Sequence, residues 1–410
     1  MKRKVFDLFL AQLFPLTASV LTVFATAVIL GPSERGKVAL ILSTAGLIGA
    51  MGYISLQVGI VRADRLGDPS AVRRGFIIAF VIAISVCMLG VGIALLIPNL
   101  SVGVFDQQSL TMVACGGGLV IFNLVVLRTR QGLGGSRVYR DAWFIQSAAF
   151  LVLAIPLALA YRSSIAVILS WFMALTASTI FALAKPDKVK REGDVQHHVS
   201  NLEIFRTSIS AHVGVAGQQL LHSADILILG VMTNAISVGI YSVAVPIAGL
   251  LWVFTEVLSL LAFDTGSKMS SVKERSVQRL RLTRLNFLVG LIGAVAIGLG
   301  SVMLLPVLLP QYAMAVPLIL ILLPGVLVQG YARIGLASIV TSGANRALIL
   351  IGLSSALLCA FYIPFVHAGG VMGAAIASSA IYGLQTVVVF LVVRNVMKKL
   401  GTQEANAVNG

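Results

Sequence analysis

Long apolar stretches separated by short polar segments run along almost the whole chain. Three of these stretches, at 75–105, 285–332 and 347–393, contain no Asp, Glu, Lys or Arg. A helix that crosses a membrane needs roughly 20 apolar residues, so the last two stretches are each long enough for two helices. Prolines or paired glycines interrupt both of them, as expected where two helices meet. The pattern therefore predicts twelve transmembrane helices, near residues 8–30, 38–61, 75–97, 109–127, 142–161, 164–184, 207–230, 238–263, 285–309, 315–340, 347–367 and 372–393.

The composition agrees with an all-α integral membrane protein. Hydrophobic residues make up 58% of the chain and charged residues only 11%, which is more apolar surface than a soluble domain buries within itself. The chain starts Met-Lys-Arg-Lys, but the apolar stretch that follows is too long for a signal peptide, so we expect a retained first helix. Cys87, Cys115 and Cys359 all lie in apolar stretches, and we expect neither a disulfide framework nor a metal cluster from them.

The basic residues predict the orientation in the membrane. A net charge of +15 suggests nucleic-acid binding in a soluble protein, but here the positive-inside rule accounts for it. With the N-terminus inside, 26 of the 30 Lys and Arg residues fall on the cytoplasmic side. Arg35, Lys37 and Arg162 fall outside, and Arg333 lies within a helix. We therefore expect a multi-pass protein of the inner or plasma membrane with both termini in the cytoplasm, and no nucleic-acid partner.

The longest polar segment divides the predicted helices six and six. It contains a charge run and the pair His197-His198, which has no Cys or carboxylate at ligand spacing and is interpreted as part of a solvated linker. The expected organisation is a six-helix lobe at 1–184, a cytoplasmic linker at 185–205, a six-helix lobe at 206–394 and a short cytoplasmic tail at 395–410.

The two halves also repeat a local pattern. Leu30-Gly31 is followed by Gly36, and Leu229-Gly230 is followed by Gly239, each time where one predicted helix ends and the next begins. A repeat in which both halves start on the same side is related by an axis along the membrane normal. That arrangement predicts two lobes around a central cavity and alternating access.

Four ionisable side chains fall deep within the predicted helices of the second half: His222, Asp225, Glu256 and Arg333. Each costs about 2.5–3.5 kcal/mol at the centre of a bilayer, so we expect a partner, a wet cavity or a role for each. His222 and Asp225 lie three residues apart on one helical face, which suggests a proton- or sodium-coupling site or a structural hydrogen bond. Glu256 and Arg333 lie seven residues from the inner ends of their helices, at 263 and 340, so their equal depth permits an ion pair.

The sequence resembles the Wzx-type polysaccharide and O-antigen flippases of the multidrug/oligosaccharidyl-lipid/polysaccharide (MOP) exporter superfamily. The segments that carry the resemblance are Leu30-Gly-Pro-Ser-Glu-Arg-Gly36, Asp225-Ile-Leu-Ile-Leu-Gly230, Val238-Gly-Ile-Tyr-Ser-Val-Ala244, Leu323-Pro-Gly325 and Gly370-Val-Met-Gly-Ala-Ala-Ile-Ala377. The resemblance implies a MATE-like fold and a flippase that moves an undecaprenyl-diphosphate-linked oligosaccharide to the outer leaflet for surface polysaccharide synthesis.

The resemblance also suggests substrate contacts. Arg333 and Glu256 form one candidate contact, in which the entering diphosphate competes with Glu256 for the guanidinium; a purely structural ion pair is the alternative. Arg62, at the inner end of the second helix, is the candidate in the first lobe. The sequence departs from the family at Ser223, two positions before Asp225, where the family often has Arg, and no charged residue lies deep in the first six helices.

Two alternatives stay open. A cation-coupled multidrug exporter of the same superfamily shares the fold, but usually needs an acidic residue within the first lobe. A membrane glycosyltransferase or polysaccharide ligase needs carboxylates on a sizeable outer loop, where Glu34 and Asp106 are the only ones expected here. No G-x-x-x-x-G-K-[ST] loop is present, so we expect a transporter rather than an enzyme, without a cofactor. The expected partners are the lipid-linked oligosaccharide, membrane lipids and a coupling proton or sodium ion.

Overall fold

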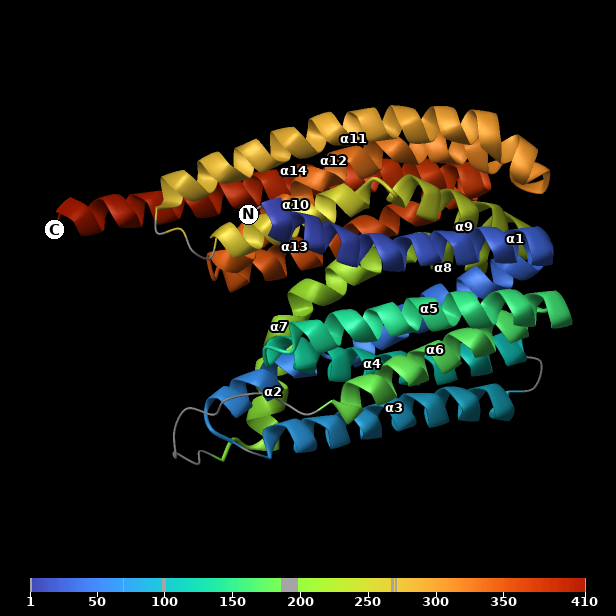
Figure 1. The fold of residues 1–410 in the computed structure, drawn as a ribbon, viewed down its shortest axis with the longest axis horizontal. Coiled ribbons are helices and arrows are strands. Elements are labelled where there is room, and N and C mark those ends of the chain that lie inside the picture. Colours follow the sequence, from blue (N-terminus) through green and yellow to red (C-terminus); the bar gives the residue numbers. More distant parts are fainter. Residues whose placement is uncertain are drawn as a thin grey trace. The chain divides into compact units, whose positions relative to one another are not determined.

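The computed structural model describes residues 2–68, 70–97, 101–185, 198–266, 269 and 271–409. The regular elements of these residues are all helices (Figure 1). In chain order they are α1 (Lys2–Gly52), α2 (Leu56–Arg65), α3 (Ala71–Leu96), α4 (Gln107–Gly132), α5 (Ser136–Tyr161), α6 (Ser164–Ala184), α7 (Asn201–Leu221), α8 (Ala224–Met232), α9 (Ala235–Gly249), α10 (Trp252–Gly266), α11 (Val272–Leu308), η1 (Pro310–Tyr312), α12 (Ala315–Thr341), α13 (Asn345–Leu358), η2 (Cys359–Phe361) and α14 (Tyr362–Asn409).

The helices are long and apolar enough to form a multi-pass membrane protein. Among the described residues, eight helices pass the length and hydropathy requirements for a span, and ten spans result if two bent pairs are each counted as one. These pairs are α7 with α8, bent by 52°, and α9 with α10, bent by 48°. Two of the eight, Phe14–Arg65 with 52 residues and Asn345–Glu404 with 60, are longer than one crossing needs, and each contains one non-helical glycine, Gly31 and Gly370. The predicted all-α membrane fold is confirmed, and the expected number of twelve spans stays a prediction.

The breaks within α1 and α14 fall at glycines. Gly31 has φ 74° and ψ 174°, and Gly370 has φ 53° and ψ −128°, conformations that only glycine adopts readily. The predicted helices end at 30 and begin again at 38, whereas the observed helix continues on both sides of Gly31. Pro32 explains the difference, because its fixed φ suits the first position of a helix and no separate loop is needed.

The chain divides into two compact units. The N-unit is Thr17–Gln219 with Gly230–Gly239, and the C-unit is Met1–Leu16 and Leu220–Leu229 with Ile240–Gly410. Most of α7 therefore packs with the helices that precede it in the chain. The backbone carbonyl of Ile204 lies close to Gly59 of α2, where a Cβ would come within 2.2 Å, and Ser208 Oγ is 3.4 Å from the carbonyl of Leu56.

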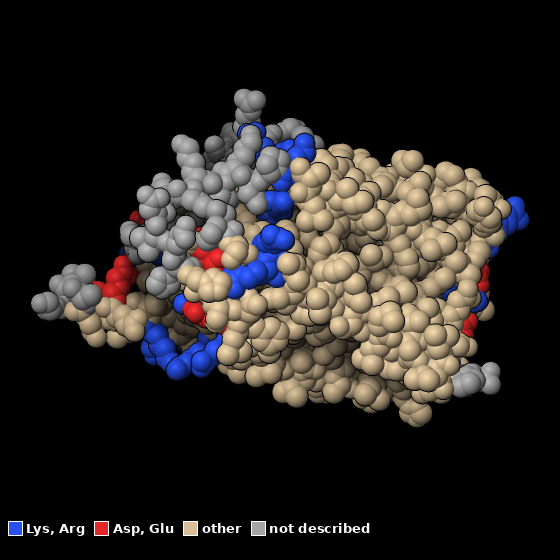
Figure 2. Space-filling view, turned by 90° about the horizontal axis from the view of Figure 1, so that it is seen from below, with Lys and Arg blue, Asp and Glu red and all other residues tan. Residues whose placement is uncertain are grey.

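The charged side chains of the N-unit lie at opposite ends of its helices. At one end, Arg65 donates to the carbonyl of Gly132, and Arg130, Arg137 and Lys185 line one pocket. At the other end, Glu34 pairs with Lys37 and accepts hydrogen bonds from Ser164 N and Oγ, at 3.0 and 2.6 Å. Figure 2 shows basic side chains gathered at the border of a broad surface without charge. This is the segregation expected from the sequence, although which end faces the cytoplasm stays a prediction.

The repeated glycines lie against each other within the N-unit. A Cβ on Gly36 would come within 1.8 Å of the Ala235 carbonyl oxygen and 2.9 Å of Gly239 N. Reciprocally, a Cβ on Gly239 would come within 1.9 Å of the Pro32 carbonyl oxygen. The second part of α1 and the start of α9 therefore cross backbone to backbone, which requires glycine at both positions. The sequence repeat thus corresponds to a symmetric helix crossing.

The C-unit contains its own core. Ile339, Ile351, Val389 and Val393 are fully buried in a cluster formed by α12, α13 and α14. Several buried polar side chains within this unit are hydrogen-bonded to one another, because burial without a partner is costly. Examples are Thr255 Oγ1 with Asn286 Oδ1, at 2.8 Å, and Gln329 Nε2 with Gln385 Oε1, at 3.1 Å. These pairs fix the register of the helices that carry the candidate site.

Candidate functional site

The ion pair between Glu256 and Arg333 lies in the C-unit. Glu256 is on α10 and Arg333 on α12, and Arg333 Nη1 contacts Glu256 Oε1. The structure therefore contains the ion pair that the equal depth of the two residues in the sequence permits. The pair is only partly shielded, since 20% of the Arg333 side chain and 43% of the Glu256 side chain are exposed. An arginine held on one side by a carboxylate still has donors that face outward.

Aromatic rings surround the guanidinium. The Arg333 Cζ atom lies 4.3 Å from the ring centroid of Trp252, close enough for a cation–π interaction. Trp252 packs against Tyr382, with their ring centroids 6.0 Å apart, and against His222, at 5.6 Å. Within one helix, Trp252 precedes Glu256 by four residues, so both side chains project from the same face of α10. We name Arg333, Glu256, Trp252, Tyr382 and His222 the arginine cluster.

Three buried nitrogen atoms of the arginine cluster have no hydrogen-bond partner among the described residues. They are Arg333 Nε, Trp252 Nε1 and His222 Nδ1. Buried polar atoms are nearly always hydrogen-bonded, and a group of exceptions within one cluster indicates a place for a polar ligand or water. Two of the three atoms are N–H donors whatever the tautomer of the histidine. The arrangement therefore suits a ligand rich in hydrogen-bond acceptors.

Asp225 forms a separate buried network. Its Oδ2 accepts a hydrogen bond from the Tyr241 hydroxyl at 2.9 Å, and its Oδ1 accepts from Ile226 N at 2.8 Å. The Tyr241 hydroxyl is also hydrogen-bonded to Ser378 Oγ at 2.8 Å, and that oxygen to the Tyr362 hydroxyl at 3.0 Å. The carboxyl of Asp225 thus ends a chain of hydroxyls that reaches α9 and both parts of α14. Such a chain can transmit a change in the charge of Asp225 to the packing of those helices.

His222 and Asp225 do not form the expected pair. Helix α7 ends at Leu221 and α8 begins at Ala224, so the two residues lie on different sides of a 52° bend. The spacing of three residues brings side chains together only in a continuous helix. The imidazole packs in the arginine cluster instead, and among the described residues no hydrogen bond joins it to the carboxylate. The expectation that both side chains share one helical face is therefore corrected; a coupling role for Asp225 stays a prediction.

Arg62 belongs to the N-unit, at the end of α2, and its side chain is exposed. Helix α2 is separated from α1 by a break at 53–55, where Ile54 and Ser55 have φ of 48° and 50°. Left-handed conformations are unfavourable for such residues, especially for β-branched isoleucine, and indicate a constrained site. Ser55 Oγ is hydrogen-bonded to His212 Nδ1 at 3.1 Å, which holds the break against α7. A substrate role for Arg62 stays a prediction.

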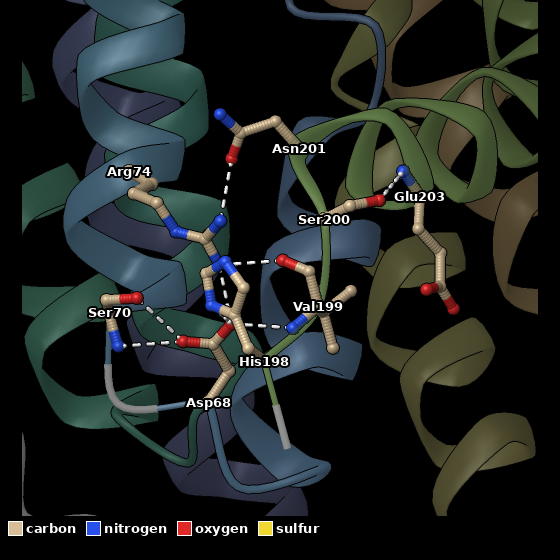
Figure 3. A network of polar contacts seen from close by, with 8 residues as sticks. All are labelled: Asp68, Ser70, Arg74, His198, Val199, Ser200, Asn201 and Glu203. Atoms are coloured by element: carbon tan, nitrogen blue, oxygen red, sulfur yellow. Dashed lines mark hydrogen bonds and ion pairs between the residues drawn. The ribbon is translucent and has the colours of Figure 1, made fainter. Parts of the chain in front are cut away.

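A polar network at one end of the N-unit holds the segment that precedes α7 (Figure 3). The Asp68 carboxylate accepts hydrogen bonds from Ser70 N and Oγ, at 3.0 and 2.8 Å, and from Val199 N at 2.9 Å. Arg74 pairs with the same carboxylate and donates to the Val199 carbonyl at 2.8 Å. The segment around Val199, just before α7, is thereby fixed to the turn between α2 and α3.

The protonation of Asp68 determines whether this network forms. Burial raises the pKa of the carboxyl, but hydrogen bonds from Ser70 and Val199 and the charge of Arg74 outweigh burial, and the pKa is lowered from its ordinary value of 3.8. His198 Nδ1 lies 3.5 Å from Asp68 Oδ2, with 75% of the histidine side chain exposed. His197 lies outside the described residues, so its interpretation as part of a solvated linker stays a prediction. His198 lies beside Asp68 in the polar network described above. Among the described residues, no group of three or more His, Cys, Asp or Glu side chains is arranged to hold a metal ion.

Sequence reasoning missed most partners of the candidate residues. Trp252 lies within a predicted helix, and its position four residues before Glu256 was the available signal. Tyr382 stacks on it from α14, far along the chain, and no local pattern indicates that contact. The hydroxyl chain at Asp225 likewise combines residues from distant helices, such as Tyr241 and Ser378.

Solved structures with a similar fold include multidrug resistance MATE family transporters. An inward-facing conformation of a multidrug resistance MATE family transporter of the MOP superfamily matches with a TM-score of 0.72 and 16% identity, over 96% of this chain and 99% of that chain. An outward-facing conformation of such a transporter matches with a TM-score of 0.64, 16% identity and coverage of 97% and 96%. A MATE structure in complex with MaL6 matches with a TM-score of 0.68 and 15% identity, over 97% of this chain and 96% of that chain. No protein-family model and no curated protein matches the sequence.

These similarities establish the fold. The chain has, along nearly its whole length, the fold of MATE transporters of the MOP superfamily, as the resemblance in its sequence implied. These structures are described as transporters, and the expected absence of an enzymatic step stays a prediction. The Wzx-type identity and the lipid-linked substrate stay predictions.

Proposed function

We propose that the chain is a cation-coupled membrane transporter of the MATE type that works by alternating access. The observation that carries the proposal is the similarity of fold over 96–97% of the chain to structures described as inward-facing and outward-facing. A fold that accommodates both conformations supports a transporter that alternates between them. Because those structures are multidrug transporters, the similarity favours an exporter of amphiphilic compounds over the other substrate classes.

Asp225 is the proposed coupling residue. Its carboxyl is buried and hydrogen-bonded through Tyr241 to Ser378 and Tyr362, so gain of a proton or of a small cation changes the charge within one connected network. A buried ionisable group within a span is expensive and, when present, often marks an ion pathway. In this proposal, occupancy of Asp225 selects between two packings of the C-unit helices. His222 has no part in the coupling step, since it packs with Trp252 and Tyr382.

A second candidate function, the flippase of a lipid-linked oligosaccharide, is favoured by the arginine cluster. Its permanent charge on Arg333 and its unpartnered N–H groups on Arg333 and Trp252 suit phosphate and hydroxyl oxygens. Within the arginine cluster, an organic cation is repelled by the guanidinium, and the carboxylate of Glu256 is already paired with Arg333. In this version, a diphosphate displaces Glu256 from Arg333; Arg62, at the end of α2 in the N-unit, stays a separate candidate contact.

The two substrate classes are distinguished by measuring both in the same purified, reconstituted protein. Ethidium efflux is followed by fluorescence in vesicles with an imposed proton or sodium gradient. Translocation of an undecaprenyl-diphosphate-linked oligosaccharide is followed by its accessibility to an added glycosidase. Gradient-dependent ethidium efflux without lipid translocation supports the exporter, and the reverse supports the flippase. If neither occurs under any gradient, the proposed transport function is wrong.

A further inference from the structure

We propose that the N-unit binds an anionic phospholipid in a groove at the basic ends of α3, α4, α5 and α6. The groove consists of two adjoining hollows that share Arg130. One, of about 780 Å³, lies between the end of α4, the start of α5 and the end of α6, with Arg137 and Lys185 on its walls. The other, of about 680 Å³, lies between α3, α4 and α6, with Arg73 on its wall.

The charged part of the groove suits a phosphate. Arg73, Arg130, Arg137 and Lys185 line it, and among the described residues that line it Asp141 is the only carboxylate. That carboxylate is paired already, because Arg140 donates to its Oδ1 from Nε and Nη2 at 2.9 and 2.8 Å. An excess of cations therefore faces the hollow, and arginine offers the paired donors that phosphate oxygens accept.

The apolar part of the groove suits an acyl chain. Phe76, Ile77 and Phe80 continue from Arg73 along α3, and Phe122 of α4 forms the opposite wall. About half of the side-chain surface of Ile77 and Phe80 is exposed, at 53% and 51%. At 1.5 Å per residue, Phe80 lies about 10 Å from Arg73 along the helix axis, toward the apolar middle of the span. A ligand with a charged head and an attached apolar chain matches both parts.

The floor of the groove is fixed by packing. Val126, Leu127, Ala142 and Ala182 are buried beneath it, and Phe76, Phe122 and Phe181 pack against them. Arg130 is 7% exposed and donates to the Leu183 carbonyl at 3.4 Å, which holds its side chain across the junction of the two hollows. Lys185 Nζ lies 5.3 Å from the Phe181 ring centroid. These contacts preform the charges, so a headgroup binds without reorganising the helices.

The location of the groove selects a lipid of the leaflet that the basic residues face. Basic pockets between transmembrane helices on the cytoplasmic side bind anionic headgroups, and the positive-inside rule predicts that this end faces the cytoplasm. Zwitterionic phosphatidylcholine carries its own cation and is disfavoured by the cluster of arginines. A soluble phosphate compound matches the charges but leaves the aromatic wall of α3 uncovered. We therefore assign the groove to an anionic diacyl lipid such as phosphatidylglycerol.

Native mass spectrometry of the delipidated full chain tests the assignment. The protein is titrated with phosphatidylglycerol, with phosphatidylcholine of the same chains, and with glycerol 3-phosphate. We expect phosphatidylglycerol to bind on the order of a hundredfold more tightly than phosphatidylcholine, because each of the three arginines contributes about fivefold. Glycerol 3-phosphate is expected not to displace the lipid at equal concentration. Equal affinity for both lipids, or displacement by glycerol 3-phosphate, overturns the proposal.

Variants locate the site. Arg137→Gln combined with Lys185→Gln changes two exposed residues without removing the buried Arg130, so the fold is retained, and the preference for phosphatidylglycerol should fall by more than tenfold. Arg281→Gln combined with Arg284→Gln is the matched control, since it removes the same charge from exposed positions on α11 of the C-unit. An unchanged preference in the first variant, or an equal loss in the control, excludes this groove as the lipid site.

Discussion

The crossing of Gly36 and Gly239 predicts opposite effects for two substitutions that look alike in sequence. Gly36→Ala places a methyl group 1.8 Å from the Ala235 carbonyl oxygen, whereas Gly46→Ala meets nothing within 4 Å. Both glycines lie in α1, and alanine is favoured over glycine within a helix by up to about 1 kcal/mol. Gly36 differs from Gly46 because the backbone of α9 lies directly against it.

The magnitude follows from the clash. A carbon and an oxygen that are not bonded need roughly 3 Å, so the two backbones must separate by roughly 1 Å along the whole crossing. Overpacking of this kind costs about 1–3 kcal/mol, and rigid backbone on the other side places Gly36→Ala toward the upper end of that range. After the gain in helix propensity, we expect Gly36→Ala to destabilise the protein by about 2 kcal/mol and Gly46→Ala to stabilise it slightly.

The assay is the apparent Tm of the purified chain in one detergent, followed by tryptophan fluorescence at a single heating rate. The Gly36→Ala variant should melt several degrees below the parent, and Gly46→Ala at or slightly above it. The reciprocal Gly239→Ala should resemble Gly36→Ala, because its methyl group meets the Pro32 carbonyl oxygen at 1.9 Å. If both Gly36→Ala and Gly46→Ala melt at or above the parent temperature, the helices do not cross as described.

Three further predictions concern the charged residues. Because the pKa of Asp68 is lowered, the contribution of this carboxylate to stability is complete above pH 3.8 and is lost as the pH falls through the lowered value. Hydrogen exchange of the Val199 amide should therefore accelerate only in strong acid in the parent protein. In Asp68→Asn the same amide should exchange faster at all pH values. Arg333→Lys retains the charge but loses paired donors, and should reduce translocation of a diphosphate-linked lipid by about tenfold or more at normal expression; full activity removes Arg333 from the substrate site. The positive-inside rule predicts that a cysteine introduced at Gln107 reacts with an impermeant thiol reagent added to intact cells. A cysteine introduced at Glu192, which is not among the described residues, should not react. The opposite pattern reverses the orientation.

Much of the fold was predictable because few backbone conformations satisfy their own hydrogen bonds within lipid. Spans without charge must be helical, so hydropathy located them, and counting residues from helix ends placed Glu256 and Arg333 at one depth. The same counting failed at His222, because neither glycine nor proline marks the break before Ala224. It also failed to indicate the left-handed Ile54, whose side chain disfavours that conformation. Tertiary contacts determine both breaks, and no periodicity in the sequence reports them.

The candidate site was predictable only in its charged residues. Ionisable side chains within spans are rare enough to be noticed, which is why Asp225 and Arg333 were found. Their neutral partners were not found, since Tyr241, Trp252 and Tyr382 are ordinary residues of apolar helices until the fold brings them to a charge. The grouping of unpartnered nitrogen atoms, which points to an acceptor-rich ligand, likewise exists only in three dimensions.

The central claim is that ion-coupled transport depends on Asp225. Asp225→Asn keeps an oxygen that accepts from the Tyr241 hydroxyl but cannot carry the charge, so it separates coupling from folding. The measurement is substrate flux, of ethidium and of the lipid-linked oligosaccharide, into reconstituted vesicles with and without a proton or sodium gradient. Glu203→Gln, an exposed carboxylate on α7, is the control. The account predicts that the gradient accelerates flux in the parent and in the control but has no effect in Asp225→Asn; an equal response to the gradient in Asp225→Asn contradicts it.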